Sequence, residues 1–149
     1  REKDDQSLYG KVMELWPRLL QAIDTDSREG RKLASRLSTW SVFITWVDDT
    51  NRDLILHVAP FAEEDYNSDE LLESIARFSA TQPLEAVAIW RALLQGSAPD
   101  YPEEAMREAL ANAVAAGEEG RCAAIAIVDE YIKRGNEKPS LWLREIQGQ

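Results

Sequence analysis

The sequence has almost none of the residues from which metal centres and hydrolytic sites are usually built. It holds one cysteine, Cys122, and one histidine, His57. One cysteine cannot form an internal disulfide or a zinc cluster, and one histidine cannot supply the usual zinc or Ser-His-Asp arrangements. We therefore expect no resident metal or other cofactor, a chain that is not itself an enzyme, and a reducing compartment, the cytoplasm. Cys122 is expected to be buried and inert on a helix stripe, and His57 to cap a helix or lie partly buried near Pro60.

Glycine-rich loops and long hydrophobic runs are also missing. The seven glycines are scattered at expected turns, whereas a phosphate-binding loop needs several of them close together before a helix. No stretch approaches the roughly 18 apolar residues that span a bilayer, and the opening residues 1–6 are too polar for a signal peptide. The sequence thus predicts a soluble chain with no nucleotide site and no membrane partner.

What is present is an ordinary globular composition of 149 residues, 44% hydrophobic and 30% charged. This length suits one folded domain, residues 1–149. The chain opens on Arg1 among charged residues and fades into polar residues at its end. We expect it to be the C-terminal piece of a larger protein.

Negative charge is concentrated in the middle of the chain. The formal net charge is −10, and residues 59–110 carry 3 basic against 11 acidic side chains, which accounts for −8 of it. Such a field repels phosphate backbones and disfavours nucleic-acid binding, although a local basic face could still touch a phosphate. That face consists of Arg28, Arg31, Lys32 and Arg36.

Apolar residues recur every three or four positions, which is the period of an α-helix. Leu8, Val12, Leu15 and Leu19 line the first helix, in which Pro17 predicts a kink or a fresh start. A second helix is predicted from Glu29 to Val47, with a stripe of Leu33, Leu37, Trp40, Ile44 and Val47.

Further helices follow along the rest of the sequence, and no convincing strand is found. They are a short helix marked by Leu54, Val58 and Phe61, a helix from Asp69 to Ala80 capped by Asn67 or Ser68, one from Pro83 to Gln95 stopped by Gly96, one from Glu103 to Ala116, one from Glu118 to Arg134, and a last short helix with Leu141, Leu143 and Ile146.

Two of these helix pairs repeat at a fixed distance. The first helices start 103 − 69 = 34 residues apart, and the second helices 118 − 83 = 35. That period is typical of stacked helix pairs, and the tetratricopeptide pattern of Trp, Leu-Gly and Tyr is missing. The predicted fold is therefore all-α, a short HEAT-like solenoid of about seven or eight helices in stacked antiparallel pairs.

A family resemblance covers residues 35 to 145. The segments 109–113 (ALANA), 121–129 (RCAAIAIVD) and 141–143 (LWL) with Gly135 resemble the last repeat of the HEAT-like C-terminal regions of large bacterial multidomain proteins, several of them in antiphage defence. Trp46 and the segment 83–86 (PLEA) are similar to earlier repeats there. The resemblance implies an architecture and no site, because the catalytic residues of such proteins lie upstream.

Two groups of residues are candidates for an interaction surface. The acidic segment Glu63, Glu64 and Asp65 with Tyr66 is the patch that we expect to meet a partner protein. Of the five tryptophans, Trp40 and Trp90 lie on predicted core stripes, whereas Trp16, Trp46 and Trp142 fit their stripes less well. An exposed tryptophan among these three would anchor a partner; Trp16 and Trp46 are the candidates. Pairs of neighbouring carboxylates, such as Asp48 and Asp49, are expected to lie in solvated loops or at helix N-termini and not to form a cation or acid-base site.

The leading functional hypothesis is a non-enzymatic interaction or scaffold module that docks on its own upstream domain or senses a partner protein. The alternative is an accessory part of an enzyme whose active site lies upstream.

In a solenoid the first helix lacks a neighbour on one side. We therefore expect residues 8 to 20 to pack against upstream chain or a second copy, and the helix around Trp142 to close the other end.

Overall fold

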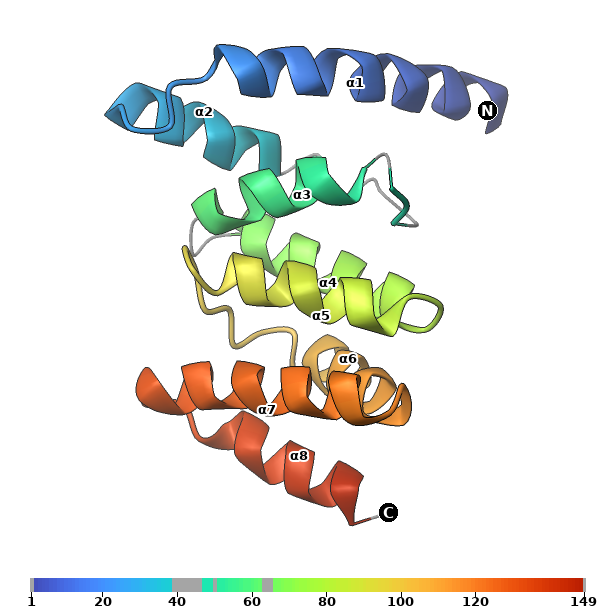
Figure 1. Ribbon diagram of the computed structural model, residues 1–149, viewed down its shortest axis with the longest axis vertical. Helices are drawn as coiled ribbons and strands as arrows, with labels where there is room; N and C mark the ends of the chain where they lie inside the picture. The colour runs from blue at the N-terminus through green and yellow to red at the C-terminus, as the bar shows by residue number, and fades with distance from the viewer. Residues whose placement is uncertain (1, 39–46, 50, 63–65, 149) are drawn as a thin grey trace.

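The fold is a column of helices (Figure 1). The structure, a computed structural model, describes residues 2–38, 47–49, 51–62 and 66–148. These residues form eight α-helices and one 3-10 helix, and no strand is found among them: α1 Glu2–Ala22, α2 Arg28–Ser38, α3 Arg52–Val58, η2 Ala59–Phe61, α4 Tyr66–Ser79, α5 Pro83–Leu93, α6 Glu103–Ala115, α7 Glu118–Lys133 and α8 Lys138–Gln147. The all-α prediction is confirmed.

Corresponding helices of successive pairs pack on each other. The pair α4 and α5 is followed by the pair α6 and α7, and α4 contacts α6 while α5 contacts α7. Figure 1 shows the layers following one another from the N-terminal to the C-terminal end. Earlier in the chain α3 contacts α5, and at the far end α8 contacts both α6 and α7. This arrangement is a short solenoid of stacked helix pairs.

The turn between α6 and α7 depends on two glycines. Gly117 has a φ of 105°, a backbone conformation that residues with a Cβ rarely adopt. Gly120 lies so near the preceding helix that a Cβ on it would be 2.0 Å from the carbonyl oxygen of Ala113. The two helices therefore approach closely at this end of the pair.

A buried polar link joins successive layers in the core. The Trp90 side chain on α5 donates a hydrogen bond from Nε1 to the hydroxyl oxygen of Tyr131 on α7, at 3.3 Å. The Tyr131 hydroxyl in turn donates to the carbonyl oxygen of Pro99, at 2.5 Å. On the other side of the stack the Asn112 amide donates to the Ser79 hydroxyl, at 2.9 Å, which joins α6 to α4. These bonds fix the register of the two pairs.

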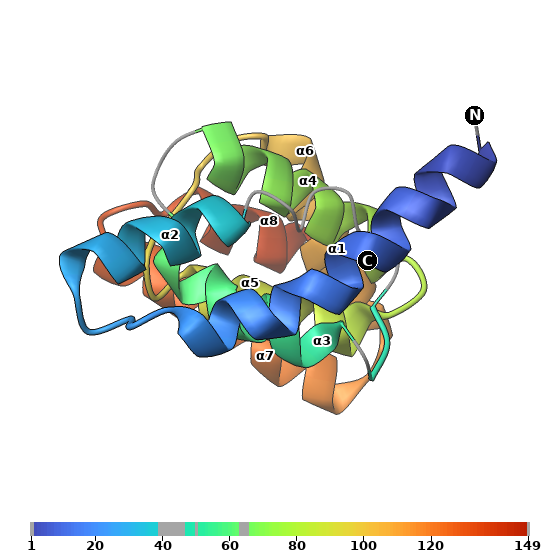
Figure 2. The ribbon, with the colours of Figure 1, turned by 90° about the horizontal axis from the view of Figure 1, so that it is seen from above.

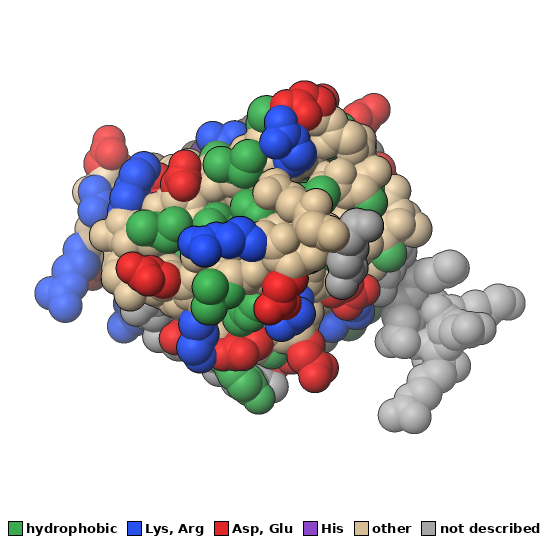
Figure 3. Space-filling model, turned by 90° about the horizontal axis from the view of Figure 1, so that it is seen from below, with side chains coloured by type: hydrophobic (Ala, Val, Ile, Leu, Met, Phe, Trp, Pro, Cys, Tyr) green, Lys and Arg blue, Asp and Glu red, His purple; other side chains and the backbone are tan. Residues whose placement is uncertain are grey.

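Trp142 is packed at the C-terminal end as predicted, although Leu141 next to it on α8 is 53% exposed. The Trp142 side chain is 7% exposed, and the Arg107 guanidinium lies over its ring, 5.9 Å from the centroid. Arg107 also pairs with Glu145 of α8 at 2.8 Å. Figure 3, which views this end, shows apolar side chains interspersed with charged ones.

Several predicted boundaries are wrong or fall outside the described residues. Helix α1 runs unbroken through Pro17, so no fresh helix starts there. The predicted cap residues Asn67 and Ser68 lie inside α4, which begins at Tyr66. The helix predicted to reach Val47 is described only as far as Ser38; Val47 itself is not helical, and Trp40, Ile44 and Trp46 lie outside the described residues.

Two residues expected on buried stripes are exposed, and one glycine has another role. Leu33 is 49% exposed, and Cys122 lies on the outer face of α7, nearly opposite the buried Tyr131 side. Gly96 does not adopt a left-handed conformation. It is needed because a Cβ there would be 2.1 Å from the carbonyl oxygen of Pro60, so the chain after α5 passes directly over η2.

Candidate functional site

The predicted acidic patch cannot be placed on the surface. Glu63, Glu64 and Asp65 lie outside the described residues, as does Trp46, and Tyr66 is the first residue of α4. The patch and its role in binding a partner stay a prediction.

Trp16 is buried rather than exposed, which corrects its assignment as an interaction anchor. Its side chain is 0% exposed and belongs to the hydrophobic core. At about 100° per residue, Trp16 lies about 80° around α1 from Leu8. Met13 and Leu20 flank it and pack against the same core. The core side of α1 is therefore centred on Trp16, and not on the stripe read from the sequence.

The stripe read from the sequence forms an open leucine seam along α1. We use this name for Leu8, Leu15 and Leu19, which are 63%, 50% and 40% exposed. Val12 lies between them and is partly buried against the core. Part of the apolar stripe of the first helix is therefore open, and the expectation that upstream chain or a second copy packs on it stays a prediction. Because burying one leucine side chain fully contributes about 1.5 to 3 kcal/mol, the open seam is a source of binding free energy for another surface.

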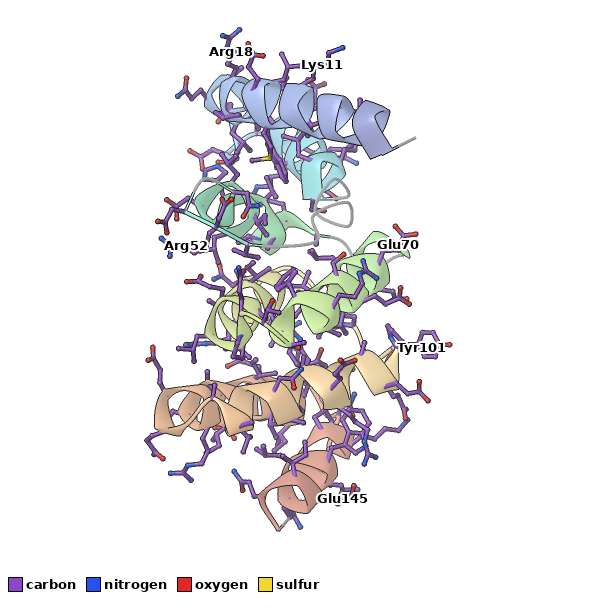
Figure 4. All side chains as sticks on the ribbon, turned by 90° about the vertical axis from the view of Figure 1, so that its right-hand side faces the viewer. Lys11, Arg18, Arg52, Glu70, Tyr101 and Glu145 are labelled. Atoms are coloured by element: carbon purple, nitrogen blue, oxygen red, sulfur yellow. The ribbon has the colours of Figure 1, made fainter. Side chains whose placement is uncertain are left out.

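The seam lies on the terminal layer of the stack. Figure 2 shows α1 crossing the top of the column and its N-terminal half extending beyond the other helices. Lys11 and Arg18 project from α1 away from the stack (Figure 4). Arg18 approaches Glu14 at 3.9 Å, but both side chains are largely exposed and such a pair adds little. The seam therefore has a hydrated, charged border on its outer side.

The second distinctive surface is the basic face of α2. This helix of 11 residues carries four exposed basic side chains and one acidic one, in a chain of net charge −10. Seven basic residues of the described chain form ion pairs. None is found for Lys11, Arg91, Arg134 and Arg144, which are scattered over three helices and a turn, or for the four that share α2: Arg28, Arg31, Lys32 and Arg36.

Three of these cations lie in the first half of α2, where they cost stability. The N-terminal end of a helix carries a partial positive charge, and a cation there is unfavourable by roughly 0.3 to 1 kcal/mol. Arg28 is the first residue of the helix, and Arg31 and Lys32 follow within about one turn. No described carboxylate offsets them by an ion pair. An anion bound from outside would offset this unfavourable charge, which the described chain itself does not.

These side chains border a groove of about 1180 Å³. One wall is α2 with the turn before it, and the opposite wall is η2 with the chain at Gly96. The lining residues are Thr25, Asp26, Arg28, Glu29, Arg31, Lys32, Pro60, Phe61, Ala62 and Gly96. The groove is thus cationic on one side and apolar on the other.

Backbone contacts hold both walls of the groove in place. A Cβ on Gly30 would lie 1.8 Å from the carbonyl oxygen of Asp24, so the turn folds tightly back on α2. The Ser27 hydroxyl donates to that same carbonyl at 2.8 Å and accepts from the Gly30 amide at 2.9 Å. Arg31 donates from Nε to the carbonyl oxygen of Thr25 at 3.1 Å, which orients its guanidinium. The cationic wall is therefore largely preformed.

A smaller groove of about 700 Å³ crosses α3, α5 and α7. The side chains of Ala88, Ala92 and Ala126 are small, so the groove offers little apolar contact area. Both acidic and basic side chains line it. Glu130 pairs with Lys133 at 2.6 Å, and Arg134 donates to the carbonyl oxygen of Leu94. Glu130 and Arg134 are thus already bonded within the chain, whereas no ion pair is found for Arg91 among the described residues.

The structure describes three of the titratable groups singled out in the sequence, His57, Asp48 and Cys122. His57 is exposed in the last turn of α3, so of the two roles expected for it the partly buried one is wrong. Asp48 accepts from the Asn51 amide at 3.0 Å at the start of α3. Cys122 lies 3.6 Å from a Glu118 carboxylate oxygen. Hydrogen bonds from Arg121 lower the pKa of Glu118.

Neither a metal cluster nor a membrane helix is found in the described residues. No three His, Cys, Asp or Glu side chains of residues 2–38, 47–49, 51–62 and 66–148 come together as a metal site would require. Within the same residues, no helix combines the length and apolar character that crossing a bilayer requires.

The groove was not predicted from the sequence. The basic residues of α2 were visible, but their opposite wall comes from residues about 30 and 60 positions further along the chain. The only signal of it was Gly96, which was interpreted as a helix stop. Comparison of the chain with protein-family models, with characterised proteins and with solved structures found no match, so the resemblance to HEAT-like bacterial tails stays a prediction.

Proposed function

We propose that the chain is a non-enzymatic helical-repeat module that binds another protein surface through the end of its solenoid. The observation that supports this proposal is the open leucine seam of α1, with side chains 40% to 63% exposed. The surface that covers it belongs either to another domain of the same polypeptide or to a separate protein.

The stacking of the solenoid supports docking at this end. Each helix pair buries an apolar face against the next pair, and a terminal layer lacks that neighbour. At the C-terminal end α8 covers the last pair with Trp142, which is only 7% exposed, and leaves the single leucine Leu141 53% exposed. At the N-terminal end the seam of α1 is open. Leu8, Leu15 and Leu19 follow one another at a helical spacing, which is how the apolar anchors of a helix enter a hydrophobic groove of a partner.

In-cell photo-crosslinking tests this proposal even though the partner is unidentified. A photoreactive residue at position 15 or 19 is expected to give an adduct of defined mass where a separate protein covers the seam, or an internal crosslink identified by peptide mass spectrometry where another domain of the same polypeptide does. The same residue at position 84 is the matched control, because Leu84 is also an exposed helical leucine, 37% exposed, but lies away from the seam.

Replacement within the seam gives the second half of the test. Leu8→Gln is expected to reduce the adduct formed at position 19, because both residues would contact the same partner, whereas Leu84→Gln leaves it unchanged. Equal crosslinking from positions 15, 19 and 84, or none from the seam, would contradict the proposal.

A further inference from the structure

The groove between α2 and η2 has features that folding alone does not explain. It combines three cations without described carboxylate partners, Arg28, Arg31 and Lys32, with an apolar wall at Pro60 and Phe61. The rest of the chain is strongly acidic. We infer that this groove binds an acidic segment of a protein partner; the inference goes beyond the proposed function, because no residue of the α1 seam lines the groove.

The length of the cationic face suits a peptide rather than a single small anion. Arg28 lines the groove, and Arg36, eight residues further on the same helix and about 12 Å along its axis, continues the cationic face beyond the lining. An extended peptide rises about 3.3 Å per residue, so about four residues span that distance. A volume of about 1180 Å³ also exceeds what one phosphate or carboxylate would fill.

The apolar wall favours a protein segment over a nucleic acid. Phe61 and Pro60, which are partly exposed, offer contacts for an aliphatic or aromatic side chain next to the partner's carboxylates. Asp26 and Glu29 also line the groove and would repel a continuous phosphate backbone. A peptide that alternates acidic and apolar residues can avoid these two carboxylates and still reach both walls.

The preformed geometry reduces the cost of binding. Arg31 is already oriented by its bond to the Thr25 carbonyl, and the tight packing of Gly30 and Gly96 fixes the two walls. Fewer side chains and less backbone then have to be ordered when the segment binds. The two acceptors of a carboxylate match the fork of the Arg31 guanidinium, whose Nε is used but whose terminal nitrogens are not held by another described residue.

Fluorescence anisotropy with two labelled peptides tests the inference on the whole chain. The probe is a short peptide of alternating Glu and Leu, and its comparison peptide has Gln in place of each Glu. We expect the acidic peptide to bind and the Gln peptide to bind at least about tenfold more weakly, with an affinity for the acidic peptide that falls as salt rises.

A charge-reversal pair locates the site. Arg28→Glu with Lys32→Glu is expected to weaken acidic-peptide binding by at least about tenfold, because two attractions become repulsions. The matched control is Lys11→Glu with Arg144→Glu, which gives the same net charge from two exposed residues on other helices. It should change affinity by less than about threefold, because α1 and α8 lie outside the groove lining. Circular dichroism checks that both variants remain folded.

The apolar wall has a separate signature. Phe61→Ala should weaken binding of the Glu and Leu peptide without changing the slope of affinity against salt, because it removes contact area and no charge. An unchanged affinity in this variant would overturn the placement of the peptide against η2.

Three other results would overturn the inference. The first is no anisotropy change with the acidic peptide at low ionic strength. The second is equal weakening by the control pair, which would show attraction to overall charge only. The third is tighter binding of a labelled single-stranded oligonucleotide that is lost in the Arg28 and Lys32 pair, which would make the groove a nucleic-acid site.

The seam on α1 separates this inference from the proposed function. Leu15→Gln should leave acidic-peptide binding unchanged, and the Arg28 and Lys32 pair should leave crosslinking from position 19 unchanged. If the peptide fails to bind while the seam still crosslinks, only the groove assignment fails. If the seam gives no adduct while the groove binds peptide, the docking end fails and the acidic-segment site remains.

Discussion

Tyr131 receives a hydrogen bond from Trp90 at 3.3 Å, and their rings meet edge to face with centroids 6.2 Å apart. The Tyr131 hydroxyl also donates to the Pro99 carbonyl at 2.5 Å, so one buried oxygen joins α5, α7 and the linker before α6. The two central helix pairs of the solenoid depend on this contact as well as on apolar packing.

Removal of that hydroxyl should weaken the fold. In Tyr131→Phe, the Trp90 indole and the Pro99 carbonyl each lose a buried partner, which should lower the free energy of unfolding by about 1 to 3 kcal/mol. Urea denaturation followed by circular dichroism measures this. Tyr101→Phe is the matched control, because Tyr101 is 68% exposed and should show almost no change. Equal effects at both positions would contradict the structural role of Tyr131.

The same residue predicts a response to alkaline pH. Burial raises the pKa of Tyr131 above its ordinary value of about 10. Because the folded state holds this proton more tightly than the unfolded state, its contribution is complete below pH of about 10 and is lost as pH rises above that value. Unfolding curves should therefore show a steeper alkaline loss of stability in the native chain than in Tyr131→Phe. Identical alkaline slopes would mean that the hydroxyl is not shielded from water.

Two glycines should respond in opposite ways to the same substitution. A Cβ on Gly120 would lie 2.0 Å from the Ala113 carbonyl oxygen, whereas Gly10 in α1 has nothing within 4 Å of such an atom. Gly10→Ala should raise the free energy of unfolding by roughly 0.5 to 1 kcal/mol through helix propensity. Gly120→Ala should lower it despite the same gain, because α6 and α7 must move apart. Thermal and urea denaturation of both variants give the comparison.

Trp16 should hold α1 on the stack. Trp16→Ala removes a side chain that is 0% exposed, and losses of this kind cost about 3 to 5 kcal/mol. Hydrogen exchange followed by mass spectrometry should show faster exchange in α1 than in the native chain. Leu15→Ala, next to it but 50% exposed, is the control that should leave exchange in α1 nearly unchanged. Protection of α1 in both variants would show that Trp16 is not its anchor.

Local signals explain which parts of the fold could be predicted from the sequence. The ends of α6 and α7 were predicted within one residue, because glutamates open each helix and a glycine with positive φ, Gly117 or Gly135, follows each one. The buried face of α1 was missed because its apolar arc is wide. Both Leu8 and Trp16 fit a helical period, and only tertiary packing decides which side is covered.

The candidate groove depends on contacts that no local pattern encodes. Its cations were visible in the sequence at Arg28, Arg31 and Lys32, but the approach of Gly96 to Pro60 brings together segments 36 residues apart. Whether Cys122 is buried could not be predicted from the local pattern either. It fits the spacing of Ile125 and Val128, but the neighbours of α7 cover the side with Ala124, Ile127 and Tyr131.

The leucine seam should contribute little to the stability of the isolated chain. Leu8→Gln, Leu15→Gln and Leu19→Gln combined should lower the free energy of unfolding by less than about 1 kcal/mol, because these side chains are already 40% to 63% exposed and glutamine is a good helix former. The comparison is Leu71→Gln, which places an amide at a position 1% exposed and should cost several times more. Urea denaturation gives both values, and binding of a hydrophobic fluorescent dye should fall only in the triple variant, since it alone removes exposed apolar surface. A loss of stability in the triple variant as large as that of Leu71→Gln would show that the seam is packed within the chain. The end of the solenoid would then have no open surface to offer a partner.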